Sequence, residues 1–201
     1  MHFNKFYFDF FYLFITNIDQ QISKNLHKFK GIVIVYNQSY ISDLTQFIKI
    51  KNLCKRNNIK FFILDNYKLA LKYKLDGLVL SHNNKTYSHN KLICKKNFTL
   101  AGKVHNQIDY NVKFHQNCSK IFLSPIFKNN KYSYNKLLKI NKFNLISRHW
   151  KKEIYALGGI NLKNINMIKM TKSEGVGFSS SFFNEEIKKP VFYLKTGFLR
   201  N

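Results

Sequence analysis

Apolar residues in this chain are concentrated in eight short runs, most of which are separated by segments of mixed polarity. The runs cover residues 12–16, 31–36, 60–65, 77–81, 98–104, 120–124, 153–158 and 175–180. Within them apolar residues follow one another without alternation, which is typical of strands buried on both faces. The pattern therefore predicts eight strands of a parallel sheet that is covered by helices.

Segments with helical spacing lie between most of these runs. They cover residues 42–58, 66–74, 106–117 and 161–172. In the first, Leu44, Phe47 and Ile48 recur at three-and-four spacing, and Ser42 is placed as an N-cap. Strands alternating with helices fit a compact (β/α)8 TIM barrel, with a doubly wound open sheet as the alternative. No linker divides the chain, so we expect one domain over residues 1–201.

Two pairs of small residues follow the last two predicted strands. Gly158 and Gly159 stand in "ALGGIN", and Ser179 and Ser180 end the final run. Glycine lets backbone N–H groups approach a bound anion, and late barrel strands often share a phosphate site. We expect one phosphate between the two pairs; a tight turn with small-residue packing is the alternative.

Acidic residues are scarce, so each one at a strand end is informative. Asp65 could hold Mg²⁺ together with a substrate phosphate, because magnesium sites need only one or two carboxylates. It could instead cap the following helix, a role for which Asn66 is an equal candidate. After the fourth run the chain reads "SHNN", so paired-carboxylate catalysis is not expected.

The histidines and cysteines give no metal motif. His82, His89 and His105 match no compact ligand spacing, and we expect His105 to form a local hydrogen bond. The three cysteines, Cys54, Cys94 and Cys118, form no C-x-x-C pair. Free thiols in a reducing cytoplasm are therefore expected.

The charge is strongly positive, at +24 from 34 Lys and Arg against 10 Asp and Glu. Such an excess can indicate a nucleic-acid partner. The lysines are scattered, however, and the abundance of Lys, Asn, Ile, Phe and Tyr is the bias of an AT-rich genome. We therefore expect no nucleic-acid partner, whereas a phosphorylated small-molecule substrate would be attracted by this field.

The apolar start of the chain raises the question of a membrane segment. Lys5 and Asp9 interrupt it, and the run over residues 10–15 is far shorter than the ~20 residues of a spanning helix. No small-residue cleavage site follows, so a signal peptide is not expected either. The segment is predicted to be a buried strand, with no membrane association.

In order along the chain, "YLFIT", "FFILDNYKLALKYKLDGLVLS", "LAGKVHN", "IFLSPIF", "YALGGIN" and "EGVGFSSSFF" resemble the thiamine phosphate synthase/TenI family. The resemblance implies a compact (β/α)8 barrel. The synthases join hydroxymethylpyrimidine diphosphate to a thiazole phosphate, with Mg²⁺ and cationic residues stabilising the departing pyrophosphate. TenI relatives instead aromatise the thiazole, using a histidine.

The resemblance also implies roles for particular residues. Gly158 and Gly159, with Ser179 and Ser180, would bind the thiazole phosphate, and Asp65 would hold Mg²⁺.

Two lysines are expected to act on the diphosphate. Lys131 stands in or next to the place of the lysine that follows the Pro-Ile-Phe loop, and Lys103 is placed to replace a missing cation.

Several family positions are altered. Leu64 replaces the asparagine of an Asn-Asp pair, Asn84 replaces the second metal aspartate, and Lys103 replaces the serine of a Ser-x-His motif. The cations of the second strand are missing, because their positions are occupied by Asn37 and Ser39. A synthase-type transferase is the leading hypothesis, and the departures leave its activity open.

Three alternatives remain. A TenI-like activity is disfavoured, because the aromatase histidine falls on Pro125, which cannot transfer a proton. A catalytically degenerate binder of thiazole phosphate or thiamine phosphate is the second, and a basic nucleic-acid-binding domain is the third. A homo-oligomer is left open.

Overall fold

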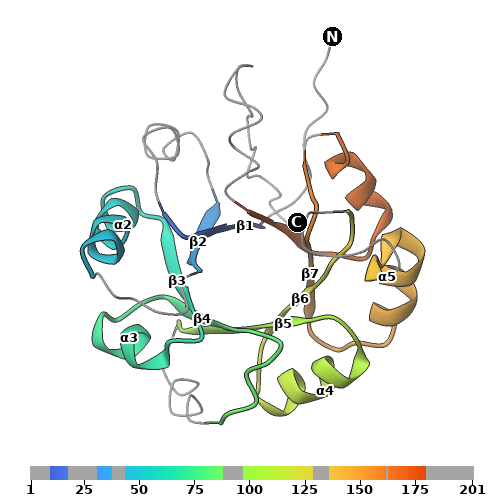
Figure 1. The fold of residues 1–201 in the computed structure, drawn as a ribbon, viewed down its shortest axis with the longest axis horizontal. Helices are drawn as coiled ribbons and strands as arrows, with labels where there is room; N and C mark the ends of the chain where they lie inside the picture. The colour runs from blue at the N-terminus through green and yellow to red at the C-terminus, as the bar shows by residue number, and fades with distance from the viewer. Residues whose placement is uncertain are drawn as a thin grey trace, which may run out of the picture.

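The computed structural model describes residues 10–17, 31–37, 44–87, 97–128, 136–161 and 163–179. Eight parallel strands close into a barrel in chain order (Figure 1). They are β1 (Phe10–Ile15), β2 (Ile32–Tyr36), β3 (Lys60–Leu64), β4 (Gly77–Leu80), β5 (Thr99–Val104), β6 (Lys120–Leu123), β7 (Glu153–Leu157) and β8 (Gly175–Ser179). The predicted TIM barrel is confirmed, and the open sheet is excluded because β8 pairs with β1.

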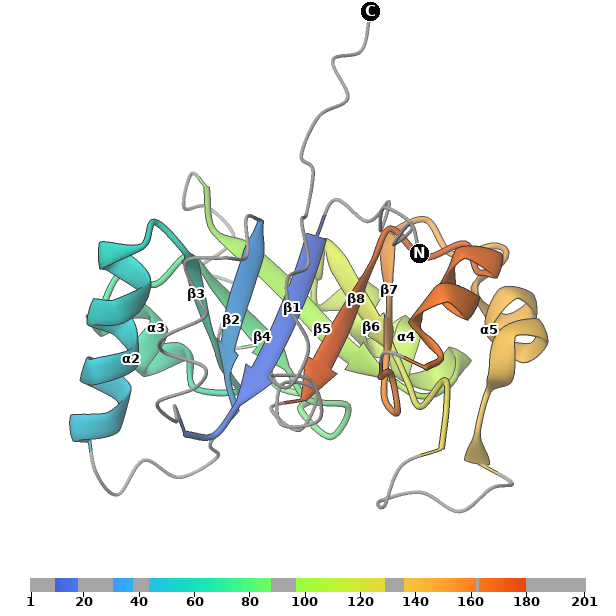
Figure 2. The same cartoon turned by 90° about the horizontal axis from the view of Figure 1, so that it is seen from above.

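Helices surround the barrel as an outer ring (Figures 1 and 2). They are α2 (Leu44–Arg56), α3 (Tyr67–Lys72), α4 (Gln107–His115), α5 (Lys139–Ser147) and the 3₁₀ helix η4 (Ile165–Met170). The helices predicted from spacing correspond to α2, α3, α4 and η4, and α5 was not predicted. The proposed N-cap Ser42 lies outside the described residues. None of the described helices has the length and apolar character needed to cross a membrane.

Successive strand residues alternate between two apolar layers. One layer lies between strands and helices; there Phe47 of α2 packs against Tyr36 and Phe61, with ring centroids 5.7 and 5.5 Å away. The other fills the barrel interior and includes Tyr12, Phe62, Phe122 and Tyr155. Burial of both strand faces explains why the apolar runs showed no alternation.

Aromatic rings form a large part of the barrel interior. The ring of Tyr12 meets those of Phe62, Phe122 and Tyr155 at centroid distances of 5.9, 4.9 and 5.1 Å. Glycine makes room for these rings: a Cβ atom at Gly77 would lie 2.6 Å from two ring carbons of Phe62. The interior is therefore a packed core, and any chemistry must take place at an end of the barrel.

A polar cluster closes the amino-terminal end of the barrel. Lys120 forms an ion pair with Glu153 and donates a 2.8 Å hydrogen bond to the hydroxyl of Tyr155. That hydroxyl donates to Oε2 of Glu153 at 2.8 Å. Burial raises the pKa of Glu153, but the hydrogen bonds from Lys120 and Tyr155 outweigh it and leave the pKa below its usual value. These charged groups satisfy one another, which leaves the opposite end as the candidate site.

Candidate functional site at the carboxyl ends of the strands

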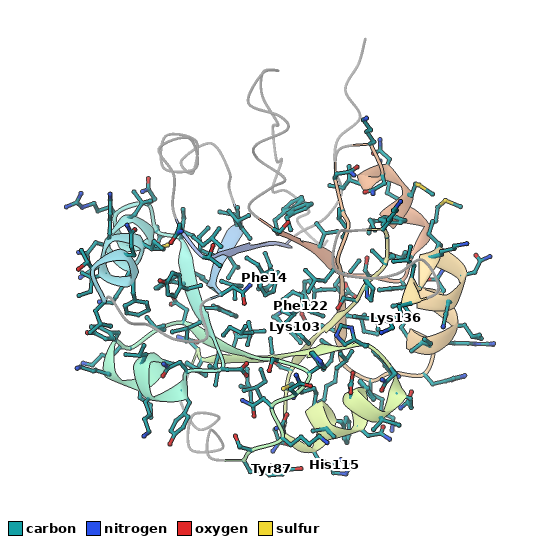
Figure 3. The ribbon with its side chains drawn as sticks, viewed as in Figure 1. Phe14, Tyr87, Lys103, His115, Phe122 and Lys136 are labelled. Atoms are coloured by element: carbon teal, nitrogen blue, oxygen red, sulfur yellow. The ribbon has the colours of Figure 1, made fainter. Side chains whose placement is uncertain are left out.

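The parallel register brings the ends of all eight strands to one edge of the barrel, where the arrowheads of β1 and β8 lie together in Figure 2. Lys103 lies on β5 within this mouth, and its Nζ is 5.2 Å from the ring centroid of Phe14. Phe14 packs edge-on against Phe122 at 5.3 Å. Figure 3 shows the three side chains together near the barrel centre. The structure thus places the ammonium group of Lys103 over the aromatic rings that close the barrel interior at this end.

Asp65 follows β3 with a backbone φ of +55°. Its Oδ1 accepts hydrogen bonds from the backbone N–H of Ser81 at 2.9 Å and from Nδ2 of Asn84 at 2.8 Å. The helix-cap role belongs to Asn66, whose Oδ1 accepts from the N–H of Leu69 at 3.1 Å. The alternative left open by the sequence is therefore decided: Asn66 caps α3, and Asp65 faces the segment after β4.

Asn84 is oriented as a donor toward Asp65. Its Oδ1 accepts from the N–H and the hydroxyl of Thr86, both at 3.1 Å, while its Nδ2 faces the carboxylate. An N–H can only donate and a carboxylate can only accept, so the network fixes which end of the amide is which. Asn84 lies beside Asp65, where a second metal ligand would be expected. It directs its side-chain nitrogen, rather than its oxygen, toward the carboxylate.

The fit to Mg²⁺ is limited to one side chain. No group of three or more His, Cys, Asp or Glu that could hold a metal occurs among the described residues. Both hydrogen bonds recorded for the Asp65 carboxylate fall on Oδ1. The chemistry of its Oδ2 suits Mg²⁺, which binds through one or two carboxylates, substrate phosphates and water. The described residues therefore fit a Mg²⁺ ion that takes one ligand from Asp65 and its other ligands mainly from substrate phosphates and water.

Two histidines, His82 after β4 and His105 after β5, pair at the same end of the barrel. Nδ1 of His105 is 2.7 Å from the carbonyl oxygen of Ser124, so this nitrogen carries the proton, and the predicted local hydrogen bond is confirmed. The rings of His82 and His105 meet edge to face at 4.5 Å. Burial lowers the pKa of His82, and the nearby His105 and Lys103 lower it further. The sequence identified His82 only as a poor metal ligand and missed this pairing, because it depends on the register of β4 and β5.

The glycine pair forms a turn against the β6 loop. Gly158 and Gly159 have φ values of +92° and +72°. A Cβ atom at Gly159 would lie 2.3 Å from the carbonyl oxygen of Phe127, and the N–H of Phe127 donates to the carbonyl of Gly158 at 3.0 Å. Glycine is thus required by the backbone itself. Leu157 at the end of β7 pairs with Gly177 of β8. The glycine turn that follows β7 therefore lies alongside the exposed Ser179 at the end of β8.

Two predicted site residues, Lys131 and Ser180, lie outside the described residues, as do His89 and Cys94. Cys54 and Cys118 are buried free thiols, and burial raises the pKa of each to about 12. The free-thiol prediction is therefore confirmed for both.

Two of the family departures have a clear structural setting. Leu64 is part of the apolar barrel interior, where an asparagine side chain would have to be hydrogen-bonded. Asn37, half-buried after β2, donates its backbone N–H to the carbonyl of Ile15 at 2.7 Å.

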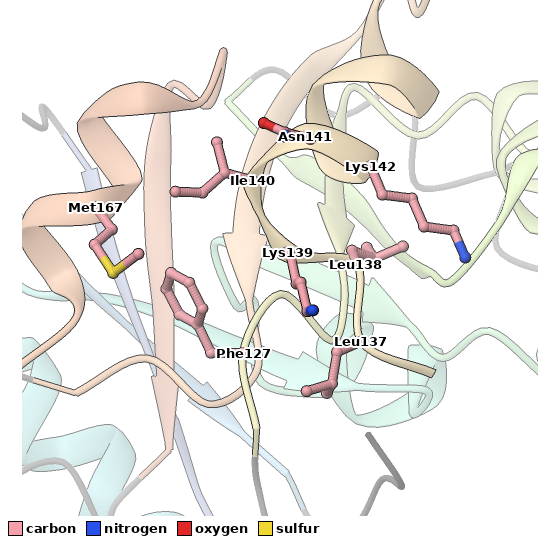
Figure 4. A pocket seen from close by; sticks show the side chains of 8 residues that line it. All are labelled: Phe127, Leu137, Leu138, Lys139, Ile140, Asn141, Lys142 and Met167. Carbon is pink, nitrogen blue, oxygen red and sulfur yellow. The ribbon is translucent and has the colours of Figure 1, made fainter. Parts of the chain in front are cut away.

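A separate pocket of about 660 Å³ opens between the β6 loop, α5 and η4. Phe127, Ile140 and Met167 line it together with Lys139 and Lys142 (Figure 4). Neither Asp65 nor Lys103 borders it, so it lies apart from the polar groups at the barrel mouth.

The closed parallel barrel and its polar, lysine-bearing mouth define a (β/α)8-barrel protein with a candidate anion site at the carboxyl ends of its strands. The chain belongs to the thiamine monophosphate synthase family, whose sequence profile matches residues 34–182.

Similar proteins agree with this membership. A thiamine-phosphate synthase from Prochlorococcus marinus (strain AS9601) is 27% identical over 146 residues, which are 73% of this chain and 42% of that protein. One from Flavobacterium psychrophilum is 27% identical over 143 residues, 68% of this chain and 69% of that protein. The match thus spans less than half of the first relative.

A solved structure supports the fold. A thiamine phosphate pyrophosphorylase from Pyrococcus furiosus superposes with a TM-score of 0.71, at 16% identity, over 89% of each chain. At this identity the superposition establishes the shared barrel, and the family assignment comes from the sequence matches.

Proposed function

We propose that the chain is a thiamine-phosphate synthase-type transferase, which joins hydroxymethylpyrimidine diphosphate to thiazole phosphate. The observation that carries the proposal is the family match over residues 34–182. The position of Lys103 at the barrel mouth supports it, because a synthase lacking the second-strand cations needs a positive charge there.

In the proposed reaction the bond between the pyrimidine methylene and the diphosphate breaks, and the thiazole nitrogen captures the resulting cation. Lys103 and Lys131 stabilise the departing pyrophosphate through charge-assisted contacts. Gly158, Gly159 and the serines at 179 and 180 hold the thiazole phosphate. Asp65 would hold Mg²⁺, which supplies further neutralisation of the diphosphate charge.

The direct test is to incubate the chain with both phosphorylated substrates and Mg²⁺ and to measure thiamine phosphate. We expect product from the unaltered chain and a loss of about 10- to 100-fold in kcat/KM for Lys103→Met, since a hydrogen bond to a charged group contributes roughly 1.5–3 kcal/mol. Lys60→Met is the matched control, because this exposed lysine begins β3 at the opposite end of the barrel. Equal activity of the two variants would contradict the role of Lys103.

The phosphate site is tested best at Ser179. Replacement of Gly159 would weaken ligand binding, but it would also displace the backbone of the β6 loop. Ser179→Asp instead adds a negative charge at an exposed strand end. We expect a higher KM for thiazole phosphate at unchanged melting temperature; an unchanged KM would remove Ser179 from the site.

The second candidate is a binder of thiazole phosphate or thiamine phosphate without synthase activity. The observation that favours it is the apolar Leu64 and the donor orientation of Asn84 at positions that carry polar and acidic residues in the family. Ligand binding measured by calorimetry, without product in the assay above, would establish this alternative. A TenI-like aromatase remains disfavoured, because Pro125 cannot transfer a proton.

We further propose that residues 1–201 form one domain that acts in the cytoplasm on small phosphorylated substrates without a nucleic-acid partner. The scattered lysines and the reduced, buried thiols support this. An RNA or DNA binding curve with a steep salt dependence would contradict it.

A further inference from the structure

Lys113, on α4, is a lysine that is completely buried, with 0% of its surface exposed. Its Nζ donates hydrogen bonds to the backbone carbonyl of Asn84 and, at 2.9 Å, to Oε1 of Gln116. Burial lowers the pKa of Lys113, and the nearby Asp65 and Asp109 act in the opposite direction. A buried ammonium group is costly unless it is well paired, so its place in the structure calls for a reason.

The neighbouring strand makes space for this side chain. A Cβ atom at Gly102 of β5 would lie 2.7 Å from Cγ and 2.8 Å from Cδ of Lys113. These carbons belong to the fixed part of the stem, so an added methyl group could not be avoided by movement of the ammonium end alone. Glycine at position 102 and lysine at position 113 therefore form a matched pair.

Gln116 is also completely buried and works with the lysine. Its Nε2 donates to the carbonyls of Asn84 at 3.0 Å and of Thr86 at 2.8 Å. Both carbonyls belong to the segment that follows β4. Two polar side chains, Lys113 on α4 and Gln116 at its C-cap, thus hold this segment through three hydrogen bonds to its backbone.

The anchored segment in turn determines the surroundings of Asp65. The side chain of Asn84, held by Thr86, directs its Nδ2 to Oδ1 of Asp65 at 2.8 Å. The N–H of Ser81, from the start of the segment, reaches the same oxygen at 2.9 Å. A continuous series of contacts therefore runs from the interior of α4 to the carboxylate at the barrel mouth.

We propose that Lys113, assisted by Gln116, is a positioning residue that orients Asp65 toward the diphosphate and its metal ion. Lys113 acts by holding the backbone carbonyl of Asn84. The side-chain amide of Asn84 and the N–H of Ser81 then occupy Oδ1 of Asp65 and leave Oδ2 as the ligand oxygen. This inference deepens the proposed function and rests on it, because it assigns Asp65 to the Mg²⁺–diphosphate part of the site.

The test is calorimetric titration of the full chain with inorganic pyrophosphate in the presence of Mg²⁺. Lys113→Met keeps most of the apolar stem and removes the ammonium group. We expect about 10- to 100-fold weaker Mg²⁺-dependent binding of pyrophosphate, the range found when an outer partner of a metal ligand is removed. Binding of thiazole phosphate should be unchanged, and Asp65→Ala should show the same selective loss.

A control separates positioning from general stability. Phe47→Leu, in α2, weakens packing between a helix and the barrel away from α4. It should lower the melting temperature without changing pyrophosphate binding. If Lys113→Met reduces both ligands in parallel, or neither, the positioning role is wrong.

Two further variants keep the test decisive if Lys113→Met does not fold. Gly102→Ala displaces the lysine without removing its charge, and Gln116→Leu removes two of the three hydrogen bonds to the segment. Either should show the same selective loss, and unaltered Mg²⁺-dependent binding in both would refute the inference. A wild-type chain that neither binds pyrophosphate nor forms product would instead refute the proposed function.

Discussion

Asp65 and Asn66 show how neighbouring side chains with the same apparent options take different roles. Either could cap α3 by sequence, yet only Asn66 does so, and Asp65 turns toward Ser81 and Asn84. The choice depends on the left-handed conformation of Asp65 and on partners 16 and 19 residues away. Local propensity does not contain this information, because the decisive donors belong to the segment that follows the next strand, β4.

His82 should make the fold sensitive to acid. Burial and the neighbours His105, Lys103 and Lys113 lower its pKa from 6.5, while Asp109 raises it in part. A group with a depressed pKa of this type binds its proton more readily when unfolded. Its contribution therefore destabilises the fold as pH falls below about 6.5, and the penalty is complete below the folded pKa.

We expect the melting temperature of His82→Asn to fall less than that of the wild type when the pH is lowered from about 7.5 to about 5. Thermal unfolding followed by circular dichroism at several pH values checks this. His115→Asn, at the exposed end of α4, is the control and should follow the wild-type curve. A steeper acid loss in His82→Asn would show that the sign is wrong.

Strands were easier to predict than helices in this chain. All eight apolar runs became strands, because burial on both faces leaves an uninterrupted apolar signal. Helix α5 was missed, since an apolar residue also lies on its exposed face and obscures the spacing: Phe143 is fully covered while Leu145 is 70% exposed. The segment expected to be an α-helix after β7 is the 3₁₀ helix η4, whose tighter turn depends on contacts to Asn161 and Asn164.

The small residues inside the strands have measurable packing roles. Gly77→Ala would place a methyl group 2.6 Å from ring carbons of Phe62 in the barrel interior. We expect a loss of about 1–3 kcal/mol in the free energy of unfolding, the usual cost of overpacking. Urea denaturation measures it.

The reason for this loss can be tested with a second substitution. Phe62→Leu shortens the opposing ring, so the double variant Gly77→Ala/Phe62→Leu should be less destabilised than the sum of the two single variants. Simple additivity would show that the glycine is needed for another reason.

Closure of the barrel assembles the candidate site from residues that are far apart in sequence. Asp65, Lys103 and Gly159 follow or belong to three different strands, and the parallel register carries all of them to one end. The expectation that strand-end residues gather was therefore predictable from fold class alone. The coupling of Lys113 to Asp65 could not be predicted in this way. A lysine within a helix is expected to be solvent-exposed unless the strand that covers it is known to carry glycine.

The net charge of +24 should make the folded state sensitive to salt. Self-repulsion among the lysines destabilises the compact chain, and screening shortens its range to about 8 Å at roughly 0.15 M salt. We expect the melting temperature to rise as potassium chloride increases from about 0.01 M to about 0.15 M. Differential scanning calorimetry checks this; a fall over the same range would mean that ion pairs outweigh repulsion.

The sequence by itself determined the barrel, its eight strands and the end of the barrel at which polar residues collect. These properties follow from hydrophobic periodicity and chain topology, which are local or general. Only the tertiary structure decided that Asn66 caps α3, that Asn84 donates to Asp65 and that Lys113 holds the backbone carbonyl of Asn84. Hydrogen bonds and buried charges depend on the register between strands and on the space left by single glycines, so they become visible only when the chain has closed on itself.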